Sequence, residues 1–85
     1  MPVTDQDVEE ARGHLLKWLK FHMDTEDITQ AELAVRLGVT PGLITQWFSG
    51  TGGTSLPSFK SLLAIKHELD VEIDFILRRD PWAKR

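Results

Sequence analysis

Residues 29–50, TQAELAVRLGVTPGLITQWFSG, constrain the fold more than any other stretch, because they combine helix-start and helix-stop residues at short spacing. Thr29 is a favourable N-cap, and Glu32 stands three residues later, at the spacing of a capping box. Gly38 follows the last apolar residue of this segment, where a left-handed C-cap suits a residue without a Cβ. Thr40 is a second N-cap. The stretch therefore predicts two short helices joined by a glycine turn.

Apolar residues at helical spacing give both segments a buried side, with Val39 in the turn between them. These residues are Ala31, Leu33, Ala34 and Leu37 in the first segment and Ile44, Trp47 and Phe48 in the second. Pro41 fits the first helical position of the second segment, because its missing N–H needs no partner there, and Gly50 ends that helix. Helix, turn and helix in this order form a helix-turn-helix motif.

The motif resembles the lambda-repressor-like (Xre/Cro-type) helix-turn-helix domains of phage repressors and many bacterial regulators. The resemblance rests on the Thr-Gln opening, Leu-Ala four residues on, Leu-Gly-Val-Thr at the turn, Ile and Trp in the second helix and the closing Gly. Residues 57–77, PSFKSLLAIKHELDVEIDFIL, look like the fourth and fifth helices of that family, and residues 5–22 fit its first helix by position. The resemblance implies an all-α fold, a compact bundle of about five short helices with a central helix-turn-helix.

The first helix is expected to run from Asp5 to about Met23, after a cap at Thr4. Its predicted core side consists of Val8, Ala11, Leu15, Trp18, Leu19 and His22. Residues 24–27, all polar, are interpreted as a linker to the motif. The predicted apolar positions of the fourth helix are Phe59, Leu62, Leu63, Ile65 and Leu69.

Length and composition predict one small domain of residues 1–85, with a core from about 5 to 79 and a basic C-terminal tail at 80–85. The chain has no cysteine, which excludes a disulfide framework and a cysteine-based metal site. No apolar run approaches the length of a membrane span, and the first ten residues are acidic, unlike a signal peptide. We therefore expect a cytoplasmic, nucleoid-associated protein without a membrane partner.

The charge balance is unusual for a DNA-binding domain, because the net charge is −3 where a basic excess is typical. Residues 1–28 carry seven acidic and three basic side chains, so the acidity lies mainly in the first helix and the segment after it. Residues 37–56 carry no charged side chain at all. Because phosphate neutralisation supplies most non-specific affinity, a monomer is expected to bind DNA weakly and with strong salt dependence.

The family resemblance implies roles for individual residues, with the second motif helix, about 41–49, in the DNA major groove. The expected DNA-contacting residues are Gln30, Thr40, Pro41, Gly42, Leu43, Thr45, Gln46, Ser49 and Lys60. Gln46 is the best base reader among them, because its amide can pair with adenine N6 and N7. Gln30 would bind a phosphate. Phe48 stands where relatives often have Glu, so a polar link to the first helix is expected to be missing.

Further phosphate contacts and a dimer surface are also expected. The candidate phosphate contacts are Lys17, Lys20, Arg78 and Arg79, and the candidate dimer surface consists of Phe75, Ile76 and Trp82. A homodimer would place two recognition helices about 34 Å apart on a palindromic operator, one turn of the DNA helix.

Catalytic and metal sites are not indicated. No nucleophile, base and orienting group form a recognisable set, so we expect no enzyme activity, no catalytic residue and no cofactor. His14, His22 and His67 lack the spacing of a metal site, and none is expected. The Gly-Thr-Gly-Gly string at 50–53 lacks the lysine and the preceding strand of a phosphate-binding P-loop.

Two functions stay open from the sequence. The first is a sequence-specific, double-stranded DNA-binding transcriptional regulator, repressor-like and homodimeric. The second is a helix-turn-helix fold used as a protein–protein interaction module of the phage or toxin–antitoxin type, with weak or no DNA binding. The acidic balance and the uncharged second motif helix support the second hypothesis, and substitution of Gln46 separates the two.

Overall fold

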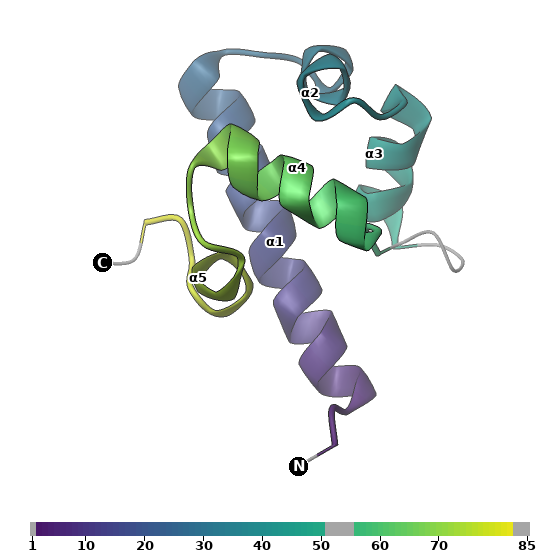
Figure 1. Cartoon of the computed structure of the whole chain (residues 1–85), viewed down its shortest axis with the longest axis vertical. Coiled ribbons are helices and arrows are strands. Elements are labelled where there is room, and N and C mark those ends of the chain that lie inside the picture. Colours follow the sequence, from purple (N-terminus) through teal and green to yellow (C-terminus); the bar gives the residue numbers. More distant parts are fainter. Residues whose placement is uncertain (1, 51–55, 83–85) are drawn as a thin grey trace.

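The computed structural model describes residues 2–50 and 56–82, and within these ranges it contains five helices and no strand. The helices are α1 (Asp5–Glu26), α2 (Gln30–Leu37), α3 (Pro41–Ser49), α4 (Phe59–Leu69) and α5 (Ile73–Arg78), as Figure 1 shows. The predicted all-α fold is confirmed. Residues 51–55, which include most of the Gly-Thr-Gly-Gly string, and residues 83–85 of the expected tail lie outside the described residues.

Hydroxyl side chains cap the first four helices. Thr4, Thr29, Thr40 and Ser58 each accept a hydrogen bond from the backbone N–H three residues further on, at 3.1–3.2 Å. The predicted capping box at Thr29 forms only in half, because the Glu32 carboxylate accepts from the Thr29 hydroxyl at 3.3 Å instead of from its amide. A complete capping box stands at the start of α1. These local bonds explain why the helices begin where the sequence places them.

The predicted linker at residues 24–27 is wrong, because α1 continues through it to Glu26. Asp27 then takes a left-handed conformation, with φ 54°, and its N–H bonds the carbonyl of Met23. Asp tolerates this conformation better than most residues do. The Glu26 carboxylate lies 3.4 Å from the Arg36 guanidinium of α2, so the extra turn of α1 is also joined to the motif.

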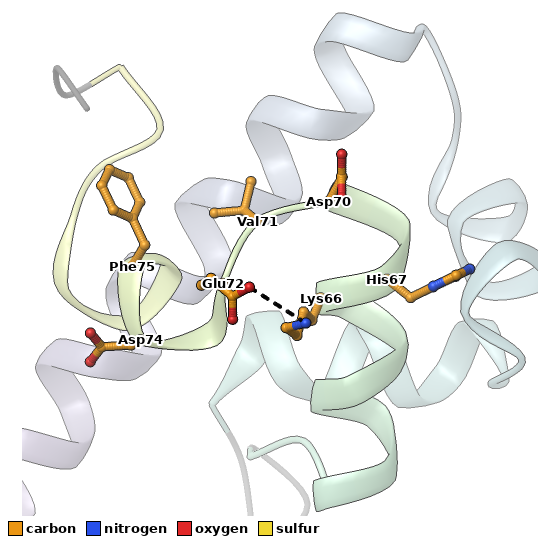
Figure 2. A pocket seen from close by; sticks show the side chains of 7 residues that line it. All are labelled: Lys66, His67, Asp70, Val71, Glu72, Asp74 and Phe75. Carbon is orange, nitrogen blue, oxygen red and sulfur yellow. Dashed lines mark ion pairs between the residues drawn. The ribbon is translucent and has the colours of Figure 1, made fainter.

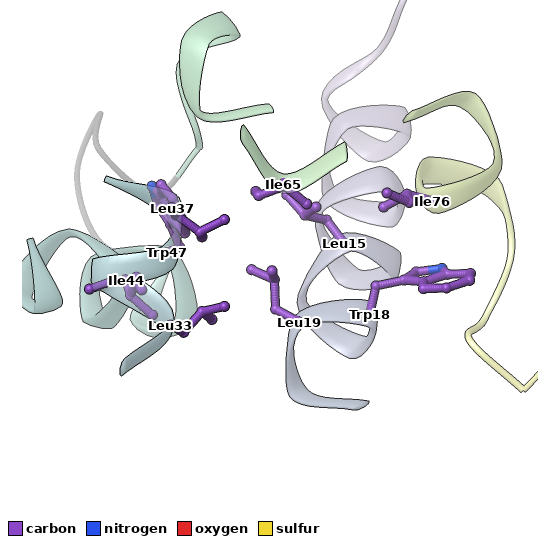
Figure 3. Close-up of a cluster of buried hydrophobic side chains, with 10 residues drawn as sticks. Leu15, Trp18, Leu19, Leu33, Leu37, Ile44, Trp47, Ile65 and Ile76 are labelled. Carbon is purple, nitrogen blue, oxygen red and sulfur yellow. The ribbon is translucent and has the colours of Figure 1, made fainter. Parts of the chain in front are cut away.

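The core is one cluster to which all five helices contribute (Figure 3). Its buried members are Leu15, Trp18, Leu19, Leu33, Ala34, Leu37, Ile44, Trp47, Ile65 and Ile76. Three predicted apolar positions are wrong: Ala31 is exposed, Phe59 is 75% exposed and Leu63 is 49% exposed. Ala31 and Phe59 lie in the first turns of their helices, at the edge of the bundle. The face of α4 that reaches the core instead carries Ser61 and Ile65.

An ionic cluster ties α1, α2 and α4 together. The Glu68 Oε2 atom lies 3.0 Å from His22 Nε2 and 3.0 Å from Arg36 Nη1. Partial burial of the Glu68 carboxyl raises its pKa, but the hydrogen bonds from His22 and Arg36 outweigh this effect and hold the pKa below its usual value. The cluster therefore favours the folded chain when Glu68 is ionised.

Glu68→Gln is expected to lower the free energy of unfolding by about 1 kcal/mol at neutral pH, because it removes charge-assisted hydrogen bonds. Since the folded pKa of Glu68 is depressed, this stabilisation is complete above the unfolded pKa of about 4.3 and is lost as the pH falls through the folded pKa. Urea denaturation at pH 7 and pH 3 measures the difference. Glu72→Gln, at an exposed ion pair with Lys66, is the control. An equal loss at both pH values would contradict the assignment.

Within the described residues, no helix has both the length and the apolar character that crossing a membrane requires.

Candidate nucleic-acid interface

The turn between α2 and α3 fixes the angle at which α3 leaves the bundle. Gly38 has φ 73°, and its N–H bonds the carbonyls of Ala34 and Val35 at the end of α2. Val39 is half-buried and packs against the core, so this apolar contact holds the turn in place. Thr40 caps α3, and Pro41 stands in its first turn, as the sequence predicts. In Figure 1, α2 and α3 lie at one end of the molecule, on the side opposite α5.

One side of α3 is buried and the other faces solvent. Ile44 and Trp47 are fully buried, and Figure 3 shows them beside the core residues of α2. The exposed residues of this region are Thr40, Pro41, Gly42, Thr45, Gln46 and Ser49. Leu43, an expected DNA contact, is only half-exposed, because its side chain packs against the core.

Gln30 at the start of α2 and Thr45 in the middle of α3 are brought together. The Thr45 hydroxyl lies 3.3 Å from Gln30 Oε1 and 3.2 Å from the carbonyl oxygen of Pro41. The single hydroxyl proton of Thr45 is donated to these two acceptors, so only the Thr45 methyl group is free to make an apolar contact with a ligand. The bond to Gln30 Oε1 leaves the Gln30 amide donors for a ligand. The first turn of α2 thus lies beside the exposed side of α3.

A polar link between α1 and α3, which the sequence predicted to be missing, is present in a different form. Phe48 carries no polar group, but the Arg12 guanidinium of α1 donates from Nη2 to the carbonyl oxygen of Trp47, in the last turn of α3. The Arg12 side chain is 13% exposed and also lies 3.6 Å from Glu9. Sequence reasoning missed this residue. Its acceptor is a backbone carbonyl, which leaves no signature in the side-chain pattern.

Comparison with known families identifies the motif. A helix-turn-helix family model matches residues 23–76, which include the whole of α2, α3 and α4 and the connecting turn. The chain belongs to this helix-turn-helix family. It is the Xre, or lambda-repressor-like, type, an all-α family of DNA-binding regulatory domains, so membership indicates double-stranded DNA as the partner. Neither a curated protein nor a solved structure matches the chain.

Few of the candidate phosphate-contacting cations are both unpaired and near the face formed by α2 and α3. Lys60 is exposed in the first turn of α4, which follows the segment that leaves α3. Lys20 is exposed on α1, and neither lysine has an ion-pair partner among the described residues. Arg78 is paired with Asp74 at 2.6 Å. In Figure 1, α5 lies on the other side of α1 from α3, so the helix that ends in Arg78 is not beside α3.

Lys17 is held by the C-terminal segment instead. Asp80 Oδ1 lies 3.4 Å from Lys17 Nζ and 3.1 Å from His14 Nδ1. The Lys17 ammonium also lies over the Trp82 ring, 5.9 Å from its centroid. The Trp18 indole donates to the carbonyl oxygen of Arg79 at 2.6 Å. Residues 79–82 are therefore fastened along α1, away from α3.

The expected dimer surface needs a correction. Ile76 is fully buried, so its side chain belongs to the core and cannot be part of an external surface. Phe75 is half-buried and meets the Trp18 ring edge-on, with centroids 5.8 Å apart. Trp82 is 65% exposed. Of the three residues, Trp82 presents the largest apolar side chain to solvent.

An open hollow of about 560 Å³ lies where α4 passes into α5 (Figure 2). Its lining consists of Lys66, His67, Asp70, Val71, Glu72, Asp74 and Phe75. Lys66 and Glu72 form an ion pair across it at 3.7 Å. No described residue of α2 or α3 belongs to this lining, so the hollow is separate from the helix-turn-helix face.

Proposed function

We propose that the chain is a sequence-specific, repressor-like regulator of transcription that inserts α3 into the major groove of double-stranded DNA. The observation that carries this proposal is the division of α3 into two sides. Ile44 and Trp47 are fully buried, while Thr45 and Gln46 are exposed, and the Thr45 hydroxyl contacts Gln30 at the start of α2. The major groove admits a helix, and its base edges carry distinguishable donors and acceptors. Gln46 is the proposed reader of an adenine.

Phosphate contacts in this proposal come mainly from neutral groups. The N-terminus of a helix favours an anion, and the Gln30 amide adds a donor at the start of α2. Lys60 supplies a positive charge from α4. Because α3 has no charge and Lys17 and Arg78 are engaged in ion pairs, one copy neutralises few phosphates and binds weakly.

We further propose that two copies act together on a palindromic operator. Weak binding by one copy becomes strong when a second copy contacts the next half-site, about 34 Å away along the DNA. Trp82 is the proposed centre of the contact between the copies, because its large apolar side chain is 65% exposed.

Gln46→Ala is expected to reduce discrimination at one position of each half-site by about 1–3 kcal/mol, because the bidentate contact with adenine is lost. The measurement is a competition titration with the duplex that the wild-type chain enriches from a randomised library. The competitor duplexes carry each of the other bases at the position that Gln46 is proposed to read. Affinity for an unrelated duplex is expected to change little, because Gln46 carries no charge.

Gln6→Ala is the matched control, since Gln6 is an exposed glutamine at the start of α1 that bonds Glu10. It is expected to leave both affinities unchanged. If Gln46→Ala also leaves the preference for the enriched duplex intact, Gln46 is not the reader.

The use of the same fold as a protein-interaction module is the second candidate function. It is favoured by the absence of charge from residues 37–56 and by the net charge of −3. This candidate predicts that the chain enriches no duplex sequence.

A further inference from the structure

The C-terminal end of α3 is closed by a residue from another helix. The last turn of α3 contains no basic side chain, although the carbonyl end of a helix favours a nearby cation. The Arg12 guanidinium of α1 supplies that cation and donates to the Trp47 carbonyl oxygen. Trp47 is fully buried, so no solvent contacts this carbonyl while Arg12 is in place. The contact spans 35 residues of sequence.

Gly50 makes room for this contact. It has φ 71°, a left-handed conformation that favours glycine, and its N–H bonds the carbonyl oxygen of Gln46 at 3.1 Å. A Cβ at this position would stand 2.8 Å from Arg12 Nη2. Gly50 therefore both ends α3 and leaves space for the guanidinium.

The same turn carries the proposed reader. Gln46 directly precedes Trp47, and its carbonyl oxygen also accepts from the Ser49 hydroxyl at 3.1 Å. Any movement of the last turn of α3 relative to α1 displaces the Gln46 side chain. Specific hydrogen bonds to base edges tolerate displacement poorly, whereas non-specific phosphate contacts depend mainly on charge.

We propose that Arg12 is a positioning residue for the recognition helix: by holding the Trp47 carbonyl from α1, it sets the pose in which Gln46 meets the bases. This inference rests on the proposed function. It assigns to a residue outside the helix-turn-helix motif a role in specificity, without contact between Arg12 and DNA.

Two measurements on the full chain test the inference. The first is amide hydrogen exchange without DNA, comparing the last turn of α3 and its C-cap, residues 46–50, with α2. In Arg12→Met, exchange in the last turn of α3 is expected to rise about tenfold beyond any change in α2, the effect of losing one charge-assisted hydrogen bond. Arg12→Lys keeps a cation at the site and is expected to restore most of the protection.

The second measurement is the affinity ratio between the enriched duplex and the same duplex with the adenine read by Gln46 replaced. Arg12→Met is expected to reduce this ratio about tenfold, with affinity for an unrelated duplex nearly constant, and Arg12→Lys to stay within about threefold of the wild type. Should Arg12→Met fail to fold, Arg12→Gln, which keeps a neutral donor, takes its place in both measurements.

The inference is overturned if Arg12→Met raises amide exchange equally in α2 and α3. It is also overturned if Arg12→Met keeps the wild-type affinity ratio between the enriched duplex and the duplex with the adenine replaced. Lys66→Met, which removes a cation from the hollow between α4 and α5, away from the helix-turn-helix face, is the control for a general effect of charge. A wild-type chain that enriches no duplex sequence refutes the proposed function and the specificity role together. The exchange experiment then still shows whether Arg12 holds the end of α3.

Discussion

Trp47→Ala is expected to lower the free energy of unfolding by about 3–5 kcal/mol, a large part of the total stability of a small domain. The Trp47 side chain is fully buried between α3 and the rest of the core. Its indole Nε1 is buried with no hydrogen-bond partner among the described residues, so the side chain stabilises the fold through apolar contact. Urea denaturation followed by circular dichroism measures the change.

Trp82→Ala is the matched control, because it removes the same side chain from a position that is 65% exposed. Its expected cost is about 0.5–1 kcal/mol, the size of an exposed cation–π contact such as that with Lys17. A loss of stability for Trp47→Ala no larger than that for Trp82→Ala would contradict the placement of Trp47 in the core.

Ile76→Ala is expected to cost about 2–5 kcal/mol of unfolding free energy, because Ile76 is a core residue and not a surface one. Self-association of the folded variant, measured by sedimentation, is expected to match that of the wild type. Trp82→Ala is expected to show the opposite result, with weakened self-association and nearly unchanged stability. Stable Ile76→Ala with impaired association would restore Ile76 to the dimer surface.

The helix-turn-helix motif could be predicted from the sequence because its determinants are local. Thr29, Gly38, Thr40 and Gly50 act through hydrogen bonds and backbone conformations within a few residues, and the structure places each one as expected. The spacing of apolar residues likewise predicts that Ile44 and Trp47 are buried, as the structure shows. Such signals need no knowledge of how the helices pack.

Positions that depend on packing could not be predicted in the same way. Apolar residues adjoin Ile76 in α5, so spacing alone does not show that Ile76 faces the core while Phe75 meets Trp18 at its edge. The pairing of Lys17 with Asp80 and Trp82 joins residues more than 60 positions apart. Arg12 contacts the backbone carbonyl of Trp47, so the identity of the Trp47 side chain does not indicate the contact.

The end of α1 illustrates a third kind of error. Four consecutive polar residues, 24–27, suggested a linker, but three of them continue the helix. Composition alone does not end a helix, and Asp27 provides the left-handed cap that glycine usually supplies. Its neighbour Glu26 is paired with Arg36, which favours the longer helix.

Selection of DNA from a randomised duplex library, at low and at physiological salt, tests the proposed function most directly. The wild-type chain is expected to enrich a two-fold symmetric motif whose half-sites lie about 34 Å apart, and the motif is expected to persist at physiological salt. Unselective retention at low salt that disappears at physiological salt would contradict the proposed function, because charge alone would then explain the binding.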